Sequence, residues 1–407
     1  MTLLEHPDAQ ALLEDAVLAP QQLEDCATHI EPFLARYFPL FQRAEQRHNA
    51  RLILLGKLSA LSRKTCEPIA HSFGVRRENL QDFVGAAPWD DRLILDELHR
   101  HVAEAWGDPC AVLIGDGSGF AKKGEHSCGV KRQYCGRLGK VDNCQVGVFL
   151  GYACQHGHTL LEHQLFLPPE WACAADRRVK AGVPEEVVYK ETWEMLLDEL
   201  DRCRDVPHAW FTCDSEFGRV NAFRAGLRQR GERYVVEVRE DVRVRDMREC
   251  PPPRRGATGR LPVAPTRSAQ EWAERQPAEA WQAFTLRGGE KGPLRVEAVE
   301  ASVQTFEDTA LGSVERLVVM RTVGADEART WYCLSDAGDE VPLGEVVWAH
   351  GQRYWAEAGF AEGKGEVGLG QYEVRGWVGW HHHMTLSLLA LWFLGLERAG
   401  EAEKTPR

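Results

Sequence analysis

The 407-residue sequence lacks the segments that direct proteins into or across membranes. Its first residues, MTLLEHPDAQALLEDAV, contain no basic leader followed by an apolar run, so we expect no secretory signal. The most apolar stretch, residues 384–396, is shorter than the roughly 20 residues that a spanning helix needs, and it contains Thr385 and Ser387. We therefore expect no membrane partner.

Cysteine is present, but it lacks the spacing of a metal site. None of the 12 cysteines belongs to a C-x-x-C pair, which argues against a zinc ribbon or finger. With no export signal, we expect reduced thiols in a cytosolic compartment. Cys213 and Cys333 lie in strand-like segments, where a free cysteine serves as a small core residue.

The chain also lacks an excess of basic residues. Its 61 acidic and 49 basic residues give a formal net charge of −12, which by itself argues against a nucleic-acid partner because phosphate binding normally leaves a basic footprint. The distribution is uneven, however, because acidic residues are concentrated in the first fifty positions and the tail. Basic residues recur in short groups: Lys122-Lys123, Lys131-Arg132, Arg177-Arg178, and residues 224–233.

The first 105 residues or so have a helical pattern. Apolar residues recur at helical spacing in HNARLILLGKLSALS and in RLILDELHRHVAEAW. Between them, KTCEPIAHSFGVRRENLQDFV predicts a short helix, a break at Gly74 and a second helix that opens with Arg76 and Arg77. This is the outline of a helix-turn-helix, and an ordinary helical hairpin fits the same pattern equally well.

After Ala111 the pattern changes to strands. AVLI followed by GDGSGFAKKG predicts a short strand that ends at Asp116 and a glycine-rich turn, and QVGVFLGYA and HTLLEHQLFL predict a hairpin that reverses at CQHGH. A helix is expected from Pro184 and Glu185. Its apolar stripe comprises Val187, Val188, Trp193, Leu196, Leu197 and Leu200. HAWFTCDSEFG then repeats the order of strand, aspartate and turn, and RYVVEVRE predicts another strand.

The second half contains a predicted β-rich insertion at about residues 251–330. CPPPRRGATGRLPVAP is rich in proline and glycine and predicts an exposed connection. LRVEAVEASV, VERLVVMRTV and TWYCLSD predict strands, with Trp272 and Trp281 near the start of the block. We expect the chain to return to helix near Leu343, in one helix that continues through RYWAEAGFAEGKG.

Asp116 and Asp214 are the first candidates for chemistry. Each follows an apolar strand and precedes a glycine-containing turn, which is where sheet enzymes hold ligands and metals. An aspartate that caps its own turn would explain either residue alone. Two such positions supply two of the carboxylates that a pair of Mg²⁺ ions needs for phosphoryl transfer, so a third carboxylate is required from a separate element.

The predicted helix around residues 353–364 can provide that carboxylate. At about 100° per residue, one face carries a row of four side chains. These are Arg353, Glu357, Phe360 and Lys364. Glu362 and Glu366 fall on the opposite face, and the glycines after Lys364 assign Glu373 to a different element. The row offers one metal-binding carboxylate between two phosphate-binding cations. A solvent-exposed helix face with an ordinary Arg/Glu pair explains the same residues.

Three consecutive histidines, His381 to His383, follow this region. Adjacent residues cannot share one face of a helix, so we do not expect these histidines to form a metal site. We expect them to begin the apolar closing helix of the chain.

Taken together, these motifs resemble those of bacterial insertion-sequence transposases with a DDE catalytic triad, in the branch with a Tyr-Arg-Glu-Lys signature. Arg353, Glu357 and Lys364 match R-x3-E-x6-K, and His350 stands at the tyrosine position. IGDGSGFAKKG resembles the first-aspartate motif, and TCDSEFG the second, with Phe217 in place of the usual tyrosine. KTCEPIA, GRLGKVDNCQVGVFL, GGEKGPL and YEVRGWVGWHHHMTLSLLALWFL also match, so the resemblance covers nearly the whole chain.

The resemblance implies an α/β fold in which an RNase H-like mixed-sheet catalytic core carries an N-terminal helical domain and a β-rich insertion. It implies a helical, DNA-binding domain at residues 1–105 and the first part of the core at 106–250. The insertion with the last core strand would span 251–335, and the glutamate helix and C-terminal helix would span 336–407. We expect a bacterial cytoplasmic protein that associates with the nucleoid.

The resemblance also implies the roles of individual residues. Asp116, Asp214 and Glu357 would hold two Mg²⁺ ions, for which Mn²⁺ substitutes, and no small-molecule cofactor is expected. The remaining predicted site residues would contact DNA: Arg353, Lys364, Lys122, Lys123, Arg76 and Arg77. Because two element ends must be paired, we expect at least a homodimer.

The implied function is a DNA transposase, an endonuclease and strand transferase that cleaves at mobile-element ends and joins them to target DNA. Two other functions fit the same residues. One is a domesticated or inactive transposase-derived regulator that only binds DNA, which the acidic net charge favours and the three carboxylates oppose. The other is a metal-dependent nuclease without strand transfer.

Overall fold

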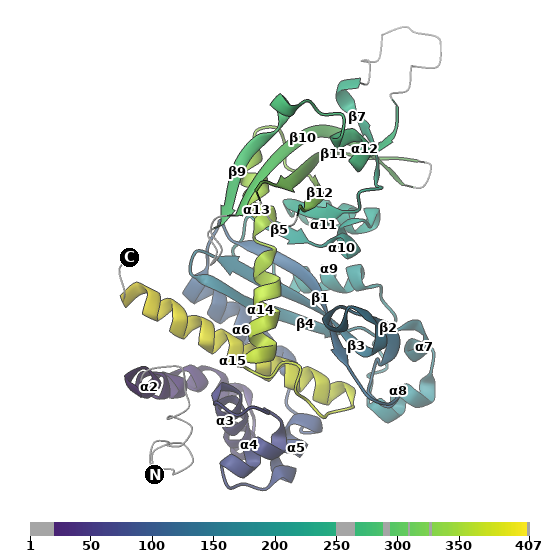
Figure 1. The fold of residues 1–407 in the computed structure, drawn as a ribbon. Coiled ribbons are helices and arrows are strands. Elements are labelled where there is room, and N and C mark those ends of the chain that lie inside the picture. The colour runs from purple at the N-terminus through teal and green to yellow at the C-terminus, as the bar shows by residue number, and fades with distance from the viewer. Residues whose placement is uncertain (1–19, 250–264, 288–293, 308–309, 325–327, 405–407) are drawn as a thin grey trace. The chain divides into compact units, whose positions relative to one another are not determined.

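The structure is a computed structural model that describes residues 20–249, 265–287, 294–307, 310–324 and 328–404 (Figure 1). These residues divide into two compact units. Unit 1 comprises the described residues of Met1–Asp108, Asp116–Pro207 and Trp355–Arg407, and unit 2 comprises those of Pro109–Gly115 and His208–Tyr354. The predicted domain boundaries near residues 105, 250 and 335 remain a prediction. Among the residues described, no helix is long and apolar enough to cross a membrane.

Unit 1 begins with a group of helices. These are α2 (Pro20–Tyr37), α3 (Ala44–Leu58), α4 (Cys66–Ser72), α5 (Arg77–Gly85) and α6 (Asp91–Trp106). Further along the chain come α7 (Pro169–Ala172), α8 (Ala175–Ala181), α9 (Thr192–Cys203), α14 (Tyr354–Gly365) and α15 (Trp377–Lys404). The helix, break and helix predicted around Gly74 are confirmed as α4 and α5, and Gly74 has a φ of 62°, which suits glycine.

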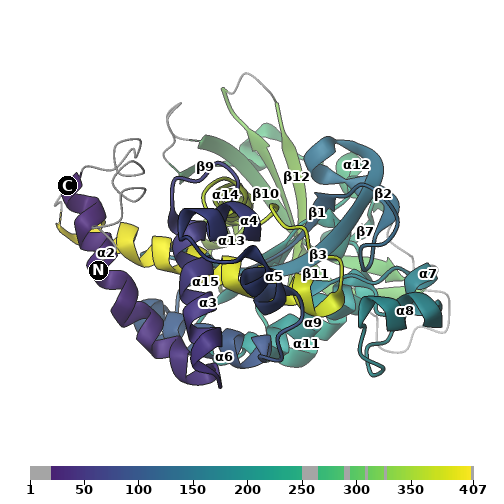
Figure 2. The same cartoon turned by 90° about the horizontal axis from the view of Figure 1, so that it is seen from below.

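The longest helix, α15, lies in the core of unit 1. Its residues 384–393 are almost completely buried, because apolar side chains occur on all sides of this part of the helix. The helix packs against α3, α5, α6 and β4 (Gly157–Leu165), between the N-terminal helices and the strands (Figures 1 and 2). The prediction that the three histidines begin the closing helix is confirmed, since α15 starts at Trp377.

The strands of unit 1 are β2 (Lys131–Cys135), β3 (Lys140–Cys154), β4, and the second part of β1 (Val112–Ala121). Strand β3 pairs in antiparallel fashion with β2 and with β4, and it is also a neighbour of β1. The hairpin predicted at CQHGH is confirmed, because β3 and β4 pair as far as Cys154 and Gly157.

The prediction that the first strand ends at Asp116 is wrong, because β1 continues to Ala121. Glycine alternates with other residues in GDGSGF, so the glycines occupy one face of an extended strand rather than a turn. The reason for glycine is visible at Gly119, where an added Cβ would lie only 3.1 Å from the Sγ atom of Cys135 on β2.

Unit 2 is built on a mixed sheet. Its strands are the first part of β1, β5 (Trp210–Cys213), β6 (Tyr234–Val238), β7 (Arg243–Asp246), β8 (Arg267–Ser268), β9 (Gln282–Arg287), β10 (Leu294–Glu307), β11 (Ala310–Thr322) and β12 (Thr330–Ser335). The pairs β1–β5 and β5–β6 are parallel, whereas β12, β11, β10, β7 and β8 continue the sheet in antiparallel pairs, and β9 pairs with β10. The predicted α/β fold class with a mixed sheet is confirmed.

The antiparallel part of unit 2 has its own hydrophobic core. The indole of Trp272 on α12 (Ala269–Ala273) is buried in it and donates a hydrogen bond of 2.8 Å from Nε1 to Asp246. The three strands predicted beyond the proline-rich segment are confirmed as β10, β11 and β12, and the strand predicted in RYVVEVRE is β6. Residues 250–264, which include most of the proline-rich segment, lie outside the described residues. The remaining helices are α10 (Ser215–Gly218), α11 (Asn221–Arg230) and α13 (Leu343–Gly351).

Two predicted helices differ in their limits. The helix expected from Pro184 begins instead at Thr192, as α9, because the backbone N–H of Glu191 donates to the side chain of Glu194 and starts the helix there. The single helix expected from Leu343 onward is divided into α13 and α14, since α13 ends at Gly351, a residue of low helix propensity.

The ten cysteines whose side chains are described are all free thiols. Cys213 on β5 and Cys333 on β12 are completely buried, which confirms their predicted place in the core.

Candidate active-site residues in the two units

Two acidic residues follow the last paired positions of the parallel strands in unit 2. Cys213 of β5 stands opposite Val236 of β6, and the next residues are Asp214 and Glu237. Because the carboxyl ends of parallel strands meet at one edge of a sheet, both carboxylates belong to the same edge, where α/β enzymes bind ligands. Sequence reasoning selected Asp214 and missed Glu237, although an acidic residue within the apolar YVVEV is a detectable signal.

Asp214 lies where strand β5 passes into the short helix α10. Its Oδ1 atom accepts a hydrogen bond of 2.9 Å from the backbone N–H of Glu216 and caps that helix. Burial raises the pKa of the Asp214 carboxyl, and the positive charge of Arg353 offsets only part of this rise. The ionised form of Asp214 would therefore gain stability from additional positive charge.

Glu237 holds two residues of the predicted signature. Its Oε1 atom accepts a hydrogen bond of 2.8 Å from Nε of Arg353, and Nε2 of His350 lies 2.9 Å from the same oxygen. Burial alone would raise the pKa of Glu237, but these two partners hold it below its usual value. His350 thus has a definite partner at the position where the signature has tyrosine.

Asp116 is the first residue of β1 that belongs to unit 1. It follows Gly115, which stands opposite Cys213 in unit 2. In an extended strand alternate residues share a face, so Asp116, Ser118 and Phe120 lie on one face of β1 and the intervening glycines on the other. Asp116 is half-buried, and its Oδ1 atom accepts a hydrogen bond of 2.8 Å from the N–H of Gly117.

Helix α14 contacts the face of β1 that carries Asp116. The Nζ atom of Lys364 donates a hydrogen bond of 2.9 Å to Oγ of Ser118 and lies 5.6 Å from the ring centroid of Phe120. Glu357 lies seven residues before Lys364, so both side chains project from the same face of α14. The Glu357 side chain is exposed.

Arg353 differs from the predicted arrangement. It precedes α14 rather than lying in it, and it belongs to unit 2, where its guanidinium is bound to Glu237. The expected row of Arg353, Glu357 and Lys364 on one helix is therefore wrong for its first member. The physical reason is that α13 ends at Gly351, which leaves Arg353 in the connection between two helices.

The predicted DNA-contacting residues of unit 1 have different surroundings. Nζ of Lys122 lies 3.2 Å from the ring centroid of Tyr372 and donates to the carbonyl oxygen of that residue, and burial lowers the Lys122 pKa to about 8. Lys123 is exposed. Arg76 directly precedes α5 and Arg77 is its first residue, and both side chains are more than half exposed.

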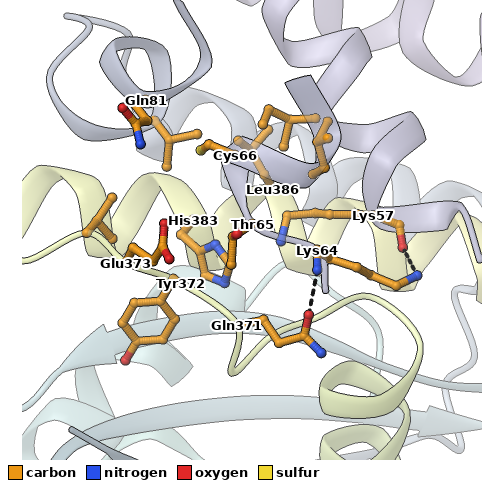
Figure 3. Close-up of a pocket in the computed structure, with 14 residues that line it drawn as sticks. Lys57, Lys64, Thr65, Cys66, Gln81, Gln371, Tyr372, Glu373, His383 and Leu386 are labelled. Atoms are coloured by element: carbon orange, nitrogen blue, oxygen red, sulfur yellow. Dashed lines mark hydrogen bonds between the residues drawn. The ribbon is translucent and has the colours of Figure 1, made fainter. Parts of the chain in front are cut away.

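Unit 1 also contains a cavity of about 230 Å³ that sequence reasoning did not anticipate (Figure 3). Two buried lysines line it. Nζ of Lys57 donates to Oγ of Ser387 over 2.8 Å, and Nζ of Lys64 donates to the carbonyl oxygen of Lys57 over 2.6 Å. Burial lowers the pKa of Lys57 to about 7 and that of Lys64 to about 8. Both ammonium groups bind acceptors of the protein itself, so we regard these lysines as part of the packing between α3, α15 and residues 367–374.

The three histidines at the start of α15 face different carbonyl groups. His381 lies 2.9 Å from the oxygen of Trp377, His382 lies 2.9 Å from that of Trp89, and His383 lies 3.1 Å from that of Leu369. In the described part of the chain, no three histidine, cysteine, aspartate or glutamate side chains are grouped so that they could hold a metal ion.

Comparison with known proteins indicates a family. A family model described as "DDE superfamily endonuclease" matches residues 36–293, which include Asp116, Asp214 and Glu237. A protein of Microchaete diplosiphon named "Probable transposase for insertion sequence element IS701" is 24% identical over 371 residues, which cover 88% of this chain and 85% of that protein.

Proposed function

This chain belongs to the DDE superfamily endonucleases, and on that premise we propose that it is a DNA transposase that cleaves at the ends of a mobile element and joins those ends to target DNA. The proposed catalytic residues are Asp116, Asp214 and Glu357. The relationship to an insertion-sequence transposase extends over most of both chains, which favours transposition over other nuclease functions.

The observation that carries the proposal is the register of two parallel strands. Gly115 of β1 stands opposite Cys213 of β5, and each of these residues is followed directly by one of the two candidate aspartates. Consecutive Cα atoms are about 3.8 Å apart, so neither Asp116 nor Asp214 can lie far from this pair. Two carboxylates that directly follow a paired position of adjacent parallel strands can supply two of the ligands that metal-assisted phosphoryl transfer requires.

Glu357 is the best candidate for the third carboxylate. The contact between Lys364 and Ser118 holds α14 against the face of β1 that carries Asp116, and Glu357 shares the face of α14 that carries Lys364. The side chain of Glu357 is exposed, so it is accessible to a metal ion and to DNA. Glu362 is a weaker candidate because it lies five residues after Glu357 and so projects from a different face of α14 than Lys364.

Each of the three residues has a carboxylate, whose oxygens are the ligands that hard divalent cations such as Mg²⁺ or Mn²⁺ prefer. Enzymes of this superfamily generally use divalent metal ions. The environment of Asp214 supports a role as a metal ligand. Burial raises the pKa of its carboxyl, and a nearby cation would favour the ionised carboxylate. Bound metal ions would activate water, and then a DNA 3′-OH, for in-line attack on a phosphodiester.

The chain's own residues would position these groups and the DNA. The hydrogen bond from Glu216 fixes the orientation of Asp214 at the end of β5. Arg353 contributes positive charge near Asp214, while its contact with Glu237 keeps the guanidinium in place. Lys364 supplies a cation on the face of α14 that carries Glu357, where a DNA phosphate would be attracted.

A strand-transfer assay tests the proposal. The full chain would be incubated with Mg²⁺ and a DNA duplex that carries the terminal repeats of the element, and cleaved and joined products would be measured. We expect both products, their loss with a chelator, and a loss of at least about 100-fold in Glu357→Gln. Glu373→Gln is the matched control, since Glu373 is exposed and paired with the surface residue Arg63.

The assay separates the proposal from its alternatives. Cleavage without joining would favour a nuclease, and binding without cleavage would favour a DNA-binding regulator. Full activity in Glu357→Gln would show that this residue is not the third carboxylate.

A further inference from the structure

One short segment of this acidic chain is strongly basic. Residues 122–141 contain six lysine or arginine residues and one acidic residue, whereas the whole chain has 49 basic and 61 acidic residues. The six basic residues are Lys122, Lys123, Lys131, Arg132, Arg137 and Lys140. The segment connects β1 to β3 and contains β2, so the positive charge is concentrated on the β2–β3 hairpin and the connection that leads into it in unit 1.

The outward side of the β2–β3 hairpin carries exposed apolar side chains beside these charges. Tyr134 stands directly opposite Val141 in the register, and their side chains therefore share a face. Tyr134 is 64% exposed, Val141 is 54% exposed and Leu138 at the hairpin turn is 40% exposed. Arg132 lies two residues before Tyr134 on the same strand face and is also exposed.

The inward side of the hairpin is anchored on β1. Cys135 is completely buried, and its Sγ atom would lie 3.1 Å from a Cβ added at Gly119. The side-chain amide of Asn143 on β3 donates to the carbonyl oxygens of Lys122 and Gly124, over 3.0 and 2.7 Å. The hairpin is thus held next to the strand on which Asp116 lies, three residues before Gly119.

We propose that the outward face of the β2–β3 hairpin binds duplex DNA beside the cleavage site. This rests on the proposed function, because the substrate of that function is DNA. Arg132 would contact a backbone phosphate, and Tyr134, supported by Val141, would pack against a deoxyribose of the DNA backbone. Charge favours DNA over a second copy of the hairpin, because two such basic surfaces would repel each other.

Acidic residues of the protein already pair with two of the basic residues of this segment. The variants to be tested therefore replace other residues of the outward face. Lys131 is paired with Glu170 over 2.6 Å, and Lys140 is paired with Asp142 over 3.2 Å. Arg132 and Tyr134 are exposed and belong to the same face, so each can be replaced without disturbing the buried side of the hairpin.

The experiment measures DNA affinity of the full chain at several salt concentrations, with a fluorescent duplex that carries the terminal repeats. We expect Arg132→Ala to weaken binding and to lower the slope of log affinity against log salt by about 1, as loss of one phosphate contact requires. Tyr134→Ala should weaken binding by about tenfold with an unchanged salt slope, since an apolar contact with a sugar releases no counterion. Arg204→Ala and Tyr189→Ala replace exposed residues elsewhere in unit 1 and should bind as wild type.

The result can also overturn the inference. Wild-type affinity and salt slope in both hairpin variants would show that the hairpin does not bind DNA. Loss of dimer formation in these variants, with unchanged affinity, would assign the surface to a second copy of the chain. Hairpin-dependent binding by a wild-type protein that does not cleave would contradict the proposed function, and it would still assign the hairpin to DNA binding.

Discussion

The Nζ atom of Lys364 donates a hydrogen bond of 2.9 Å to Oγ of Ser118 and so joins helix α14 to strand β1 within unit 1. Each partner lies on the element that carries a proposed catalytic carboxylate. Ser118 is two residues after Asp116, and Lys364 is seven residues after Glu357. The contact therefore fixes one element relative to the other at the place where the reaction is proposed.

We expect Lys364→Met to reduce DNA cleavage by at least about tenfold, because the substitution removes both the contact with Ser118 and a cation that attracts phosphate. Cleavage rate and DNA affinity would be measured on the same duplex. Ser118→Ala separates the two effects, since it removes the contact and keeps the charge. Unchanged cleavage in both variants would contradict a positioning role for this pair.

Glu237→Gln tests whether Glu237 influences Asp214. The carboxylate of Glu237 raises the pKa of Asp214, so its replacement by a neutral amide should lower that pKa. Activity that requires ionised Asp214 would then persist to lower pH, and the acidic limb of the pH–rate profile would shift toward lower pH. Glu240→Gln, at an exposed position just after the same strand, should leave the profile unchanged. A shift toward higher pH in Glu237→Gln would contradict the expectation.

Lys57→Met tests how much the burial of an ammonium group reduces the free energy of unfolding. Burial lowers the pKa of Lys57 from 10.5 to about 7, so between these values the unfolded chain binds more protons than the folded chain. The free energy of unfolding should therefore rise as the pH increases from about 7 to 10.5, by up to about 1.4 kcal/mol per pH unit. In Lys57→Met the rise should be smaller, as measured by urea unfolding at several pH values above 7.

The control for this measurement is Lys180→Met, which replaces an exposed lysine of unit 1 and should keep the wild-type pH dependence. Lys64 is also buried and has a lowered pKa, so some rise should remain in Lys57→Met. An identical pH dependence in Lys57→Met and the wild type would show that the ammonium of Lys57 is not destabilised by burial.

Glu315→Ala should destabilise unit 2 by about 3–5 kcal/mol, because it would leave the buried guanidinium of Arg224 without its carboxylate partner. Glu315 accepts hydrogen bonds of 2.9 Å from Arg224 and 2.6 Å from the hydroxyl of Tyr234. Glu297→Ala is the matched control, since Glu297 pairs with the half-exposed Arg321 and should cost less than about 1 kcal/mol. If chemical unfolding showed the same loss of unfolding free energy in the two variants, the expectation would be wrong.

Local pattern was sufficient for much of the fold. Alternating or continuous apolar residues predicted β3, β4, β6, β10, β11 and β12, because strand formation depends on side chains that are close in the sequence. The same reasoning failed at GDGSGF, where glycine and aspartate suggested a turn. The segment is a strand because its backbone pairs with β3 and β5, and Gly119 leaves room for Cys135 of β2. Both contacts involve residues from other strands.

By itself, the sequence determined which residues are candidates for chemistry: two aspartates that follow apolar segments and a glutamate that precedes a lysine on one helix face. Only the tertiary structure decided that Arg353 binds Glu237, that Lys364 binds Ser118, and that Lys57 is buried. Each partner in the first two contacts comes from more than 100 residues away in the chain. A local pattern records the propensities of neighbours, whereas hydrogen-bond partners and burial depend on how distant segments pack together.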